Sequence, residues 1–170
     1  MDGNVEVRKG TISIFNGPSP DISIFEDQQS EEAAVGDWIR ARLEGGVAPE
    51  EIGVIVRSGL ELARAKAACT NASTVFHVLD NPGEWKPDSV AICTMHLAKG
   101  LAFRAVVVMA YDDEVLPLQS RIESVVDGSD LEEVYATERH LLYVACTRAR
   151  VHLLVSGVEP ASEFLSDLVQ

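Results

Sequence analysis

The chain has 170 residues, of which 46% are hydrophobic and 24% are charged, so it is long and apolar enough to bury the core of one domain. Its formal charge is −13, from 27 acidic and 14 basic residues, which excludes a general nucleic-acid-binding coat. Any contact with nucleic acid must therefore be local, near the few basic side chains that stand apart from the acidic runs.

The cysteine, histidine and leader patterns exclude several other classes. Three cysteines (Cys69, Cys93 and Cys146) lack the paired spacing of a zinc site or a disulfide framework, and the histidines are scattered. No window of about 18 apolar residues occurs, and no basic stretch precedes an apolar one at the N-terminus. We expect a soluble protein of the reducing cytoplasm, with free thiols, no metal site and no membrane contact.

The first quarter of the chain predicts two short strands and a helix. Residues 1–10 are polar and read as a loose lead-in, whereas 11–15 and 22–25 alternate as strands do. A stripe of apolar residues at helical spacing then predicts a helix over 30–43, with Ser30 as its N-cap and the pair Gly45-Gly46 at its end.

The middle of the chain repeats the unit of a parallel sheet. A buried strand over 52–56 ends at Arg57-Ser58, an alanine-rich helix follows over 60–70, and a further strand is expected over 75–79. A loop with two prolines then leads to two apolar runs, 90–93 and 105–110, which are typical of strands buried on both faces.

A polar cluster separates these two runs. Thr94, His96, Lys99 and Gly100 place a hydroxyl, an imidazole, an ammonium and a flexible backbone after the first of the two strands. Ligands of open α/β sheets bind beyond the carboxyl ends of strands, so this segment is a candidate site.

The C-terminal part of the chain contains a second cluster of polar residues that could form a site. A long acidic loop over 111–129 precedes an amphipathic helix over 131–145, capped by Ser129 or Asp130. Thr147, Arg148 and Arg150 fall at the end of this helix, before a strand over 151–156 and a short amphipathic helix over 160–168. Arginine matches phosphate oxygens bidentately, so phosphate recognition is a fair hypothesis.

Three segments carry a family resemblance. Residues 94–103, read as TMHLAKGLAF, resemble motif V of UvrD/Rep-like superfamily 1 DNA helicases, and residues 142–149, read as LYVACTRA, resemble motif VI. Residues 53–58 resemble the strand just upstream in the same domain. Because the three matches occur in family order, the resemblance is specific. It implies an α/β, RecA-like three-layer domain: a mostly parallel sheet flanked by helices.

The resemblance also implies roles. Arg148 matches the arginine finger that reaches the γ-phosphate of ATP bound at the other RecA-like domain, and Lys99 and Gly100 match positions on the nucleotide side. Arg57, Ser58, Thr94 and His96 match positions near single-stranded DNA. Each residue also has a structural alternative. Arg148 could complement a helix C-terminus, and Lys99 could be a surface lysine. Arg57 could form an ion pair with a neighbouring acid, and His96 could be a histidine satisfied inside the fold.

Departures from the family pattern limit these expectations. Ala102 stands where the family usually has glutamate, and about ten loop residues replace a large helical insertion before motif V. A phosphate-binding loop and an Asp-Glu strand for Mg²⁺ are also missing. We therefore expect residues 1–170 to be the second RecA-like domain of an ATP-dependent helicase, inactive without the first domain that binds ATP and Mg²⁺.

A different class competes with this prediction. A non-catalytic adaptor of the same fold would bind a protein partner through the acidic 111–130 loop or the C-terminal helix. The charge of −13, Ala102 and the missing motifs favour the adaptor, whereas the intact TRA and HLAKG segments favour the helicase.

Overall fold

The computed structural model describes residues 20–81, 84–164 and 168, and these form one six-stranded sheet in the order β1-β6-β5-β2-β4-β3. All five strand pairings are parallel. The strands are β1 (Asp21–Phe25), β2 (Ile52–Val56), β3 (Phe76–Val78), β4 (Val90–Thr94), β5 (Phe103–Val108) and β6 (Ala149–Val158). The predicted α/β class is confirmed, while the predicted lead-in over 1–10 and strand over 11–15 lie outside the described residues.

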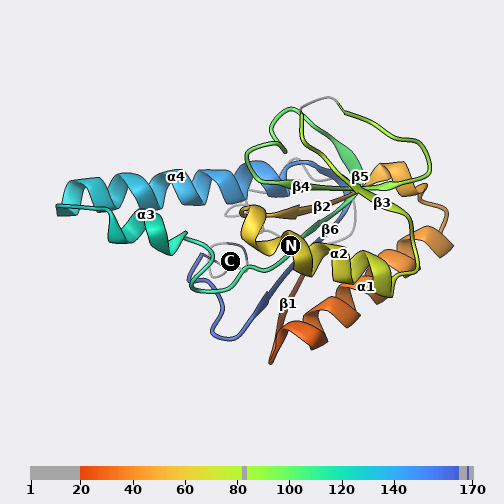
Figure 1. Ribbon diagram of the computed structural model, residues 1–170, viewed down its shortest axis with the longest axis horizontal. Helices are drawn as coiled ribbons and strands as arrows, with labels where there is room; N and C mark the ends of the chain where they lie inside the picture. The colour runs from red at the N-terminus through yellow and green to blue at the C-terminus, as the bar shows by residue number, and fades with distance from the viewer. Residues whose placement is uncertain (1–19, 82–83, 165–167, 169–170) are drawn as a thin grey trace, which may run out of the picture.

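Helices cover both faces of the sheet (Figure 1). Helices α1 (Gln28–Glu44) and α2 (Leu62–Asn71) pack against one face, and α4 (Gly128–Cys146) packs against the other. Alternate residues of β2 point to opposite layers: Val54 and Val56 lie in the core under α1 and α2, and Ile55 lies in the core under α4. Burial on both faces explains why the central strands read as unbroken apolar runs.

Helices α1 and α2 approach each other closely at a glycine. A Cβ atom built on Gly36 would lie 2.8 Å from Cβ of Asn71 and 3.0 Å from the carbonyl oxygen of Ala68. No side chain larger than hydrogen fits between the two helices at this point, so Gly36 sets their spacing.

Both long helices begin earlier than the sequence predicts. The side chain of Asp27 accepts a hydrogen bond from the Ser30 amide at 2.8 Å, so Asp27, not Ser30, is the N-cap of α1. In the same way Asp127 caps α4 by accepting from the amides of Ser129 and Asp130, which were the predicted caps. At each of these two ends an aspartate carboxylate accepts from amides of the first helical turn that have no partner within the helix.

The predicted loop over 111–129 contains structure of its own. A short helix, α3 (Gln119–Glu123), and the start of α4 lie within it, and together they project beyond the sheet (Figure 1). The predicted helix over 60–70 is divided into a 3₁₀ turn, η4 (Gly59–Glu61), and α2, and a further 3₁₀ turn, η3 (Pro49–Glu51), precedes β2.

The prediction of a helix over 160–168 is wrong for its first part. Residues 160–164 are not helical, because Ala161 forms an isolated bridge with Asp112 and the chain then turns. Among the helices in the described part of the chain, none is long and apolar enough to cross a membrane.

Candidate functional site

The connection between β4 and β5 spans the sheet without a helix. It runs over residues 95–102, from the carboxyl end of β4 to the amino end of β5, and crosses β2, which lies between these strands. Met95 and Ala98 anchor it in the core beneath α4, and the Met95 amide donates to the Val56 carbonyl at 2.8 Å. One short segment therefore reaches both the carboxyl ends of the strands, called here the carboxyl edge, and their amino ends, the opposite edge.

The carboxyl edge brings together three of the predicted DNA-contacting residues. Val56 pairs with Thr94, the last residue of β4, so Ser58, two residues after β2, lies near Thr94, and His96 is exposed just beyond it. The hydroxyl of Ser58 is already used, since it donates to Oε1 of Glu61 at 2.9 Å and accepts from the Leu60 amide at 3.2 Å. Thr94 and His96 are the more available donors at this edge.

Arg57 is placed differently from its predicted role. Only 4% of its surface is exposed, and its Nε and Nη2 atoms donate to the two carboxylate oxygens of Glu138 at 2.8 and 2.6 Å. The structure thus has the ion pair that was the alternative. In this conformation the guanidinium of Arg57 does not reach a phosphate, and its contact with DNA stays a prediction that would need this pair to open.

Glu138 was given no role by the sequence, yet it joins three elements. Besides Arg57 after β2, its carboxylate accepts from the Leu118 amide and from Nη1 of Arg121, each at 2.9 Å. Burial alone would raise the pKa of Glu138, but these hydrogen bonds and the charge of Arg57 outweigh it, so the pKa lies below 4.5. Its position four residues before Leu142, on the buried face of α4, is a signal that could have identified it.

The opposite edge of the sheet holds Arg148 and the end of the β4–β5 connection. Arg148 follows Thr147, the C-cap of α4, and its Nε donates to the Val144 carbonyl at 3.0 Å. Nη1 donates to the Leu101 carbonyl at 2.9 Å, and Nη2 donates to Oγ1 of Thr147 at 3.1 Å. The half-buried guanidinium thus complements the helix C-terminus and fastens the connection to α4.

Lys99 and Gly100 lie on the same side as Arg148. Both are exposed, and Gly100 has a φ of 84°, a conformation that L side chains rarely adopt. Ala102 is exposed next to Leu101. The connection therefore separates the predicted site residues into two groups, with Thr94 and His96 near one edge and Lys99, Gly100 and Arg148 near the other.

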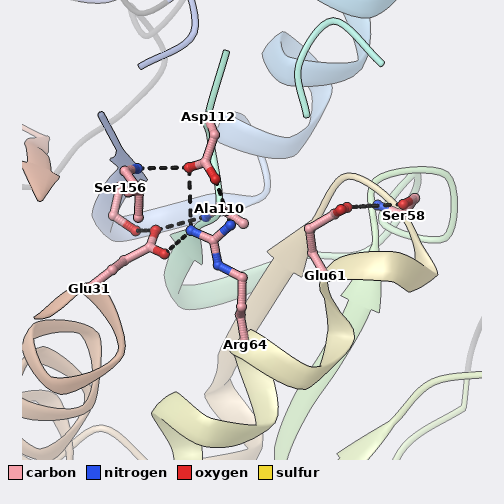
Figure 2. Close-up of polar contacts among 8 residues, drawn as sticks. Glu31, Ser58, Glu61, Arg64, Ala110, Asp112 and Ser156 are labelled. Atoms are coloured by element: carbon pink, nitrogen blue, oxygen red, sulfur yellow. Dashed lines mark hydrogen bonds and ion pairs between the residues drawn. The ribbon is translucent and has the colours of Figure 1, made fainter. Parts of the chain in front are cut away.

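A second buried network lies on the other face of the sheet (Figure 2). Arg64 of α2 pairs with Glu31 of α1 and donates to Asp112, after β5, from Nη1 at 2.6 Å. Glu31 also accepts from the Ala110 amide at 2.8 Å and from the Ser156 hydroxyl at 2.7 Å. Burial would lower the pKa of Arg64, but Asp112 and Glu31 reverse that effect and raise it.

The described residues contain no group of three or more His, Cys, Asp or Glu side chains arranged to hold a metal ion. The three cysteines are buried, and burial raises the pKa of each thiol to about 12, so they stay protonated and inert.

Curated relatives share this segment of sequence. The chain is 40% identical over 67 residues to the ATP-dependent DNA helicase UvrD2 of Mycobacterium bovis, and 38% identical over 81 residues to the ATP-dependent DNA helicase Rep of Buchnera aphidicola. These matches cover 39% and 47% of the chain but only 9% and 11% of the relatives. The chain thus spans about a tenth of the length of the relatives it matches.

A solved structure shares the fold. It is described as the C-terminal domain of a "possible DNA helicase" from Lactobacillus plantarum WCFS1, with a TM-score of 0.70 and 21% sequence identity. The superposition covers 94% of this chain and 88% of that one, which shows a common architecture over nearly all of both. Family models match residues 71–159, just over half of the chain, and by this match the chain belongs to the UvrD-like helicase C-terminal domain family.

Proposed function

We propose that the chain is the second motor domain of an ATP-dependent DNA helicase or translocase. In this proposal Arg148 serves the γ-phosphate of ATP held at a first RecA-like domain, and the Ser58, Thr94 and His96 edge forms part of a single-stranded DNA track. The relatives with matching sequence are ATP-dependent DNA helicases, which supports the activity but not the residue roles.

The observation that carries the proposal is the connection over residues 95–102. It is fixed to β2 through Met95 at one edge of the sheet and to Arg148 through the Leu101 carbonyl at the other. A displacement of either anchor is passed along a segment only eight residues long, with Met95 and Ala98 buried in a close-packed core. The connection can therefore link what happens to a nucleotide with what happens to DNA.

Arg148 can serve as an arginine finger, because its present partners can be replaced by a phosphate. Its guanidinium is half-buried, and its three described partners are two carbonyls and one hydroxyl, none of them a carboxylate. A phosphate oxygen is a stronger acceptor than these neutral groups, so the exchange of partners is favourable. When bound, ATP with Mg²⁺ supplies the phosphoryl group, and Lys99 and Gly100 lie on the same side to meet its oxygens.

The DNA edge offers a hydroxyl and an imidazole as donors. The Thr94 hydroxyl and the exposed His96 imidazole can donate to phosphate or base, which makes the DNA contact local in a chain of net charge −13. Arg57 acts behind this edge, where its buried pair with Glu138 holds the end of β2 in place.

The test is ATP hydrolysis by the full-length protein that contains this chain, with and without single-stranded DNA. Arg148→Ala should lower kcat by about 10² or more, because arginine fingers contribute about 10³ to 10⁵ in phosphoryl transfer. Arg150→Ala, which changes an exposed arginine two residues away, is the matched control and should keep the wild-type rate.

Two further measurements separate the finger from a structural role. Arg148→Lys keeps the charge but loses the fork, so it should fold normally and still lose most of the rate. Single-stranded DNA binding by Arg148→Ala should be unchanged, whereas His96→Ala should weaken DNA binding. Wild-type hydrolysis by the Arg148 variants would refute the proposal.

One observation favours an adaptor as the second candidate. The projecting segment of α3 and α4 exposes apolar side chains, with Val126 90% and Leu131 36% exposed, among the acids of the 111–130 region. A protein partner could cover this surface. Absence of hydrolysis in the full-length protein, together with partner binding that is lost in Val126→Asp, would favour this alternative.

A further inference from the structure

Two adjoining hollows form an apolar groove on the projecting segment, called here the α3–α4 groove. Their volumes are about 310 and 320 Å³, and Leu131 lines both of them. Because Leu131 and Tyr135 are four residues apart, they lie on one face of α4 and continue the groove along this helix. The apolar side chains that line the groove come from α3, from the turn after it and from α4: Ile122, Val125, Val126, Leu131 and Tyr135.

The α3–α4 groove is open to solvent although its lining is apolar. Val126 is 90% exposed and Leu131 is 36% exposed, and the segment that carries them projects beyond the sheet (Figure 1). A single exposed apolar side chain is ordinary on a protein surface. Five apolar side chains that line one continuous hollow are instead typical of a surface that another molecule covers.

The exposed charges along the groove have one sign. Between residues 122 and 135 the chain has no lysine or arginine, and its acidic residues, all exposed, are Glu123, Asp127, Asp130, Glu132 and Glu133. Asp127 stays ionised near neutral pH, because hydrogen bonds from the Asp130 amide and from the hydroxyl and amide of Ser129 lower its pKa. An apolar groove is thus bordered by negative charge.

The two arginines at the ends of the groove are directed elsewhere. Nη1 of Arg121 lies 2.9 Å from the carboxylate of the buried Glu138. Arg139 lines the second hollow, but its guanidinium carbon lies 4.9 Å from the centroid of the Phe164 ring. The middle of the groove therefore presents acidic side chains to a ligand.

The walls of the groove favour a ligand that has already satisfied its own backbone. The groove is bounded by α3 and α4, and the backbone groups inside a helix are bonded within that helix. As the structure describes it, the groove offers side chains rather than the open edge of a strand, to which an extended peptide would add. A helix brings its backbone bonds with it and can lay one apolar stripe into such a groove.

We propose that the α3–α4 groove binds an amphipathic helix of a partner protein, with apolar side chains in the groove and lysines or arginines beside its acidic borders. The five acids attract such a helix and repel nucleic acid and anionic membranes. They also disfavour a second copy of this chain, since each copy has a net charge of −13.

The proposal rests on the surface that the second candidate function names, and it adds the chemistry of the partner. It applies to a motor domain as well as to an adaptor, because it involves neither Arg148 nor His96. Hydrolysis of ATP by the full-length protein therefore tests the proposed function, whereas binding of a helix to the 170-residue chain tests the groove.

The experiment is a titration of a fluorescein-labelled peptide with the 170-residue chain, followed by fluorescence anisotropy. The probe is a peptide of leucine and lysine, about 18 residues long, whose leucines recur at a spacing of three and four. The control peptide has the same composition, with its leucines distributed around the helix. The probe should bind saturably and about tenfold more tightly than the control peptide, because it alone can place all its leucines in one groove.

Uncharged substitutions decide whether the groove is responsible. Val126→Ser and Leu131→Asn should each weaken binding of the probe about tenfold, the loss expected when one apolar side chain is removed from an interface. Leu60→Asn changes a leucine of η4 that is 84% exposed, and this matched control should bind as the wild type does. All three positions are exposed, so the variants keep the fold, which circular dichroism checks.

Charge substitutions test the acidic borders. The double variant Glu132→Gln, Glu133→Gln should bind the probe more weakly than the wild type, with a smaller dependence on salt. The double variant Glu26→Gln, Glu44→Gln has the same net charge but changes exposed acids elsewhere, so it should keep the wild-type affinity.

Three results would overturn the proposal. The first is no saturable binding of the probe at the highest soluble concentration of the chain. The second is equal binding of the two peptides with no effect of Leu131→Asn, which would leave only non-specific attraction to acidic residues. The third is a dimer of the chain in sedimentation velocity that Leu131→Asn abolishes, which would identify a second copy as the occupant.

Discussion

Glu31 and Glu138 are two fully buried carboxylates on helices that cover opposite faces of the sheet, and each is paired with a buried arginine. Glu31 pairs with Arg64, and Glu138 pairs with Arg57. Removal of a carboxylate from water is costly, and in both places several hydrogen bonds offset that cost. The chemistry of the two clusters is thus nearly the same.

The elements that the two clusters join are different. The partners of Glu31 come from α2, β6 and the end of β5, all within the body of the domain (Figure 2). The partners of Glu138 are the strand end beside the candidate DNA edge and the projecting segment at Leu118 and Arg121. The first cluster ties together elements in the body of the domain, whereas the second connects a candidate site with the projecting segment at α3.

The largest effect is expected from Glu31→Gln. It leaves Arg64 with half of its charge compensation inside the core, so the free energy of unfolding should fall by about 4 kcal/mol, within the range for breaking a buried pair. Urea unfolding followed by circular dichroism measures this loss. Glu32→Gln, at the next position on α1, should change it by less than about 0.5 kcal/mol. A loss below about 1 kcal/mol in Glu31→Gln would show that the Glu31 cluster contributes little to the stability of the domain.

Glu138→Gln should cost somewhat less, about 3 kcal/mol, because Arg121, one of its partners, is 36% exposed and can turn to water. It should also weaken binding of single-stranded DNA by the full-length protein, which Glu31→Gln should leave unchanged in the folded fraction. Equal effects of the two substitutions on DNA binding would contradict the distinction between the clusters.

The stability of the protein should depend on pH through Glu138, the carboxylate of the second cluster. The folded-state pKa of Glu138 lies below its ordinary value of 4.5, so its contribution is complete above about pH 4.5 and is lost as the pH falls through the folded-state pKa. The difference in unfolding free energy between wild type and Glu138→Gln should therefore be constant near neutral pH and shrink in acid. If this difference in unfolding free energy grew in acid, the prediction would be wrong.

The smallest effect is expected from Arg121→Ala. A half-exposed ion pair contributes at most about 1 kcal/mol, so global stability should barely change. Hydrogen exchange should become faster in α3 but not in α1, because this pair joins Arg121 of α3 to Glu138 of α4. Unchanged exchange in α3 would assign its position to the Leu118 hydrogen bond alone.

The sheet was predictable because its signals are local. The runs 52–56 and 90–93 are apolar on both faces, and such runs identify buried strands without knowledge of their partners. The helix starts were misplaced because aspartate and serine are both good N-caps, and local preference does not rank Asp27 above Ser30. Helix α3 was missed because five residues are too few to carry a helical pattern or to form a helix alone.

The pairing of charges could not be predicted in the same way. Arg57 and Glu138 are 81 positions apart, and the sequence shows many acids that could equally have partnered Arg57. The grouping of Thr94 with Ser58 could be expected from neighbouring strands, whereas the bond from Arg148 to the Leu101 carbonyl depends on a main-chain atom that no side-chain pattern reports.

The strand order has a consequence for how the domain is made. β2 has no partner until β4 and β5 have been synthesised, and among the described strands β1 pairs with β6 alone, so that Asp21 is made long before its partner Leu154. Parallel pairings between such distant segments lose loop-closure entropy before their contacts form, so the pairings form slowly. During translation β1 therefore leaves the ribosome long before β6, its neighbour in the described sheet, and the β1–β6 pairing is completed last.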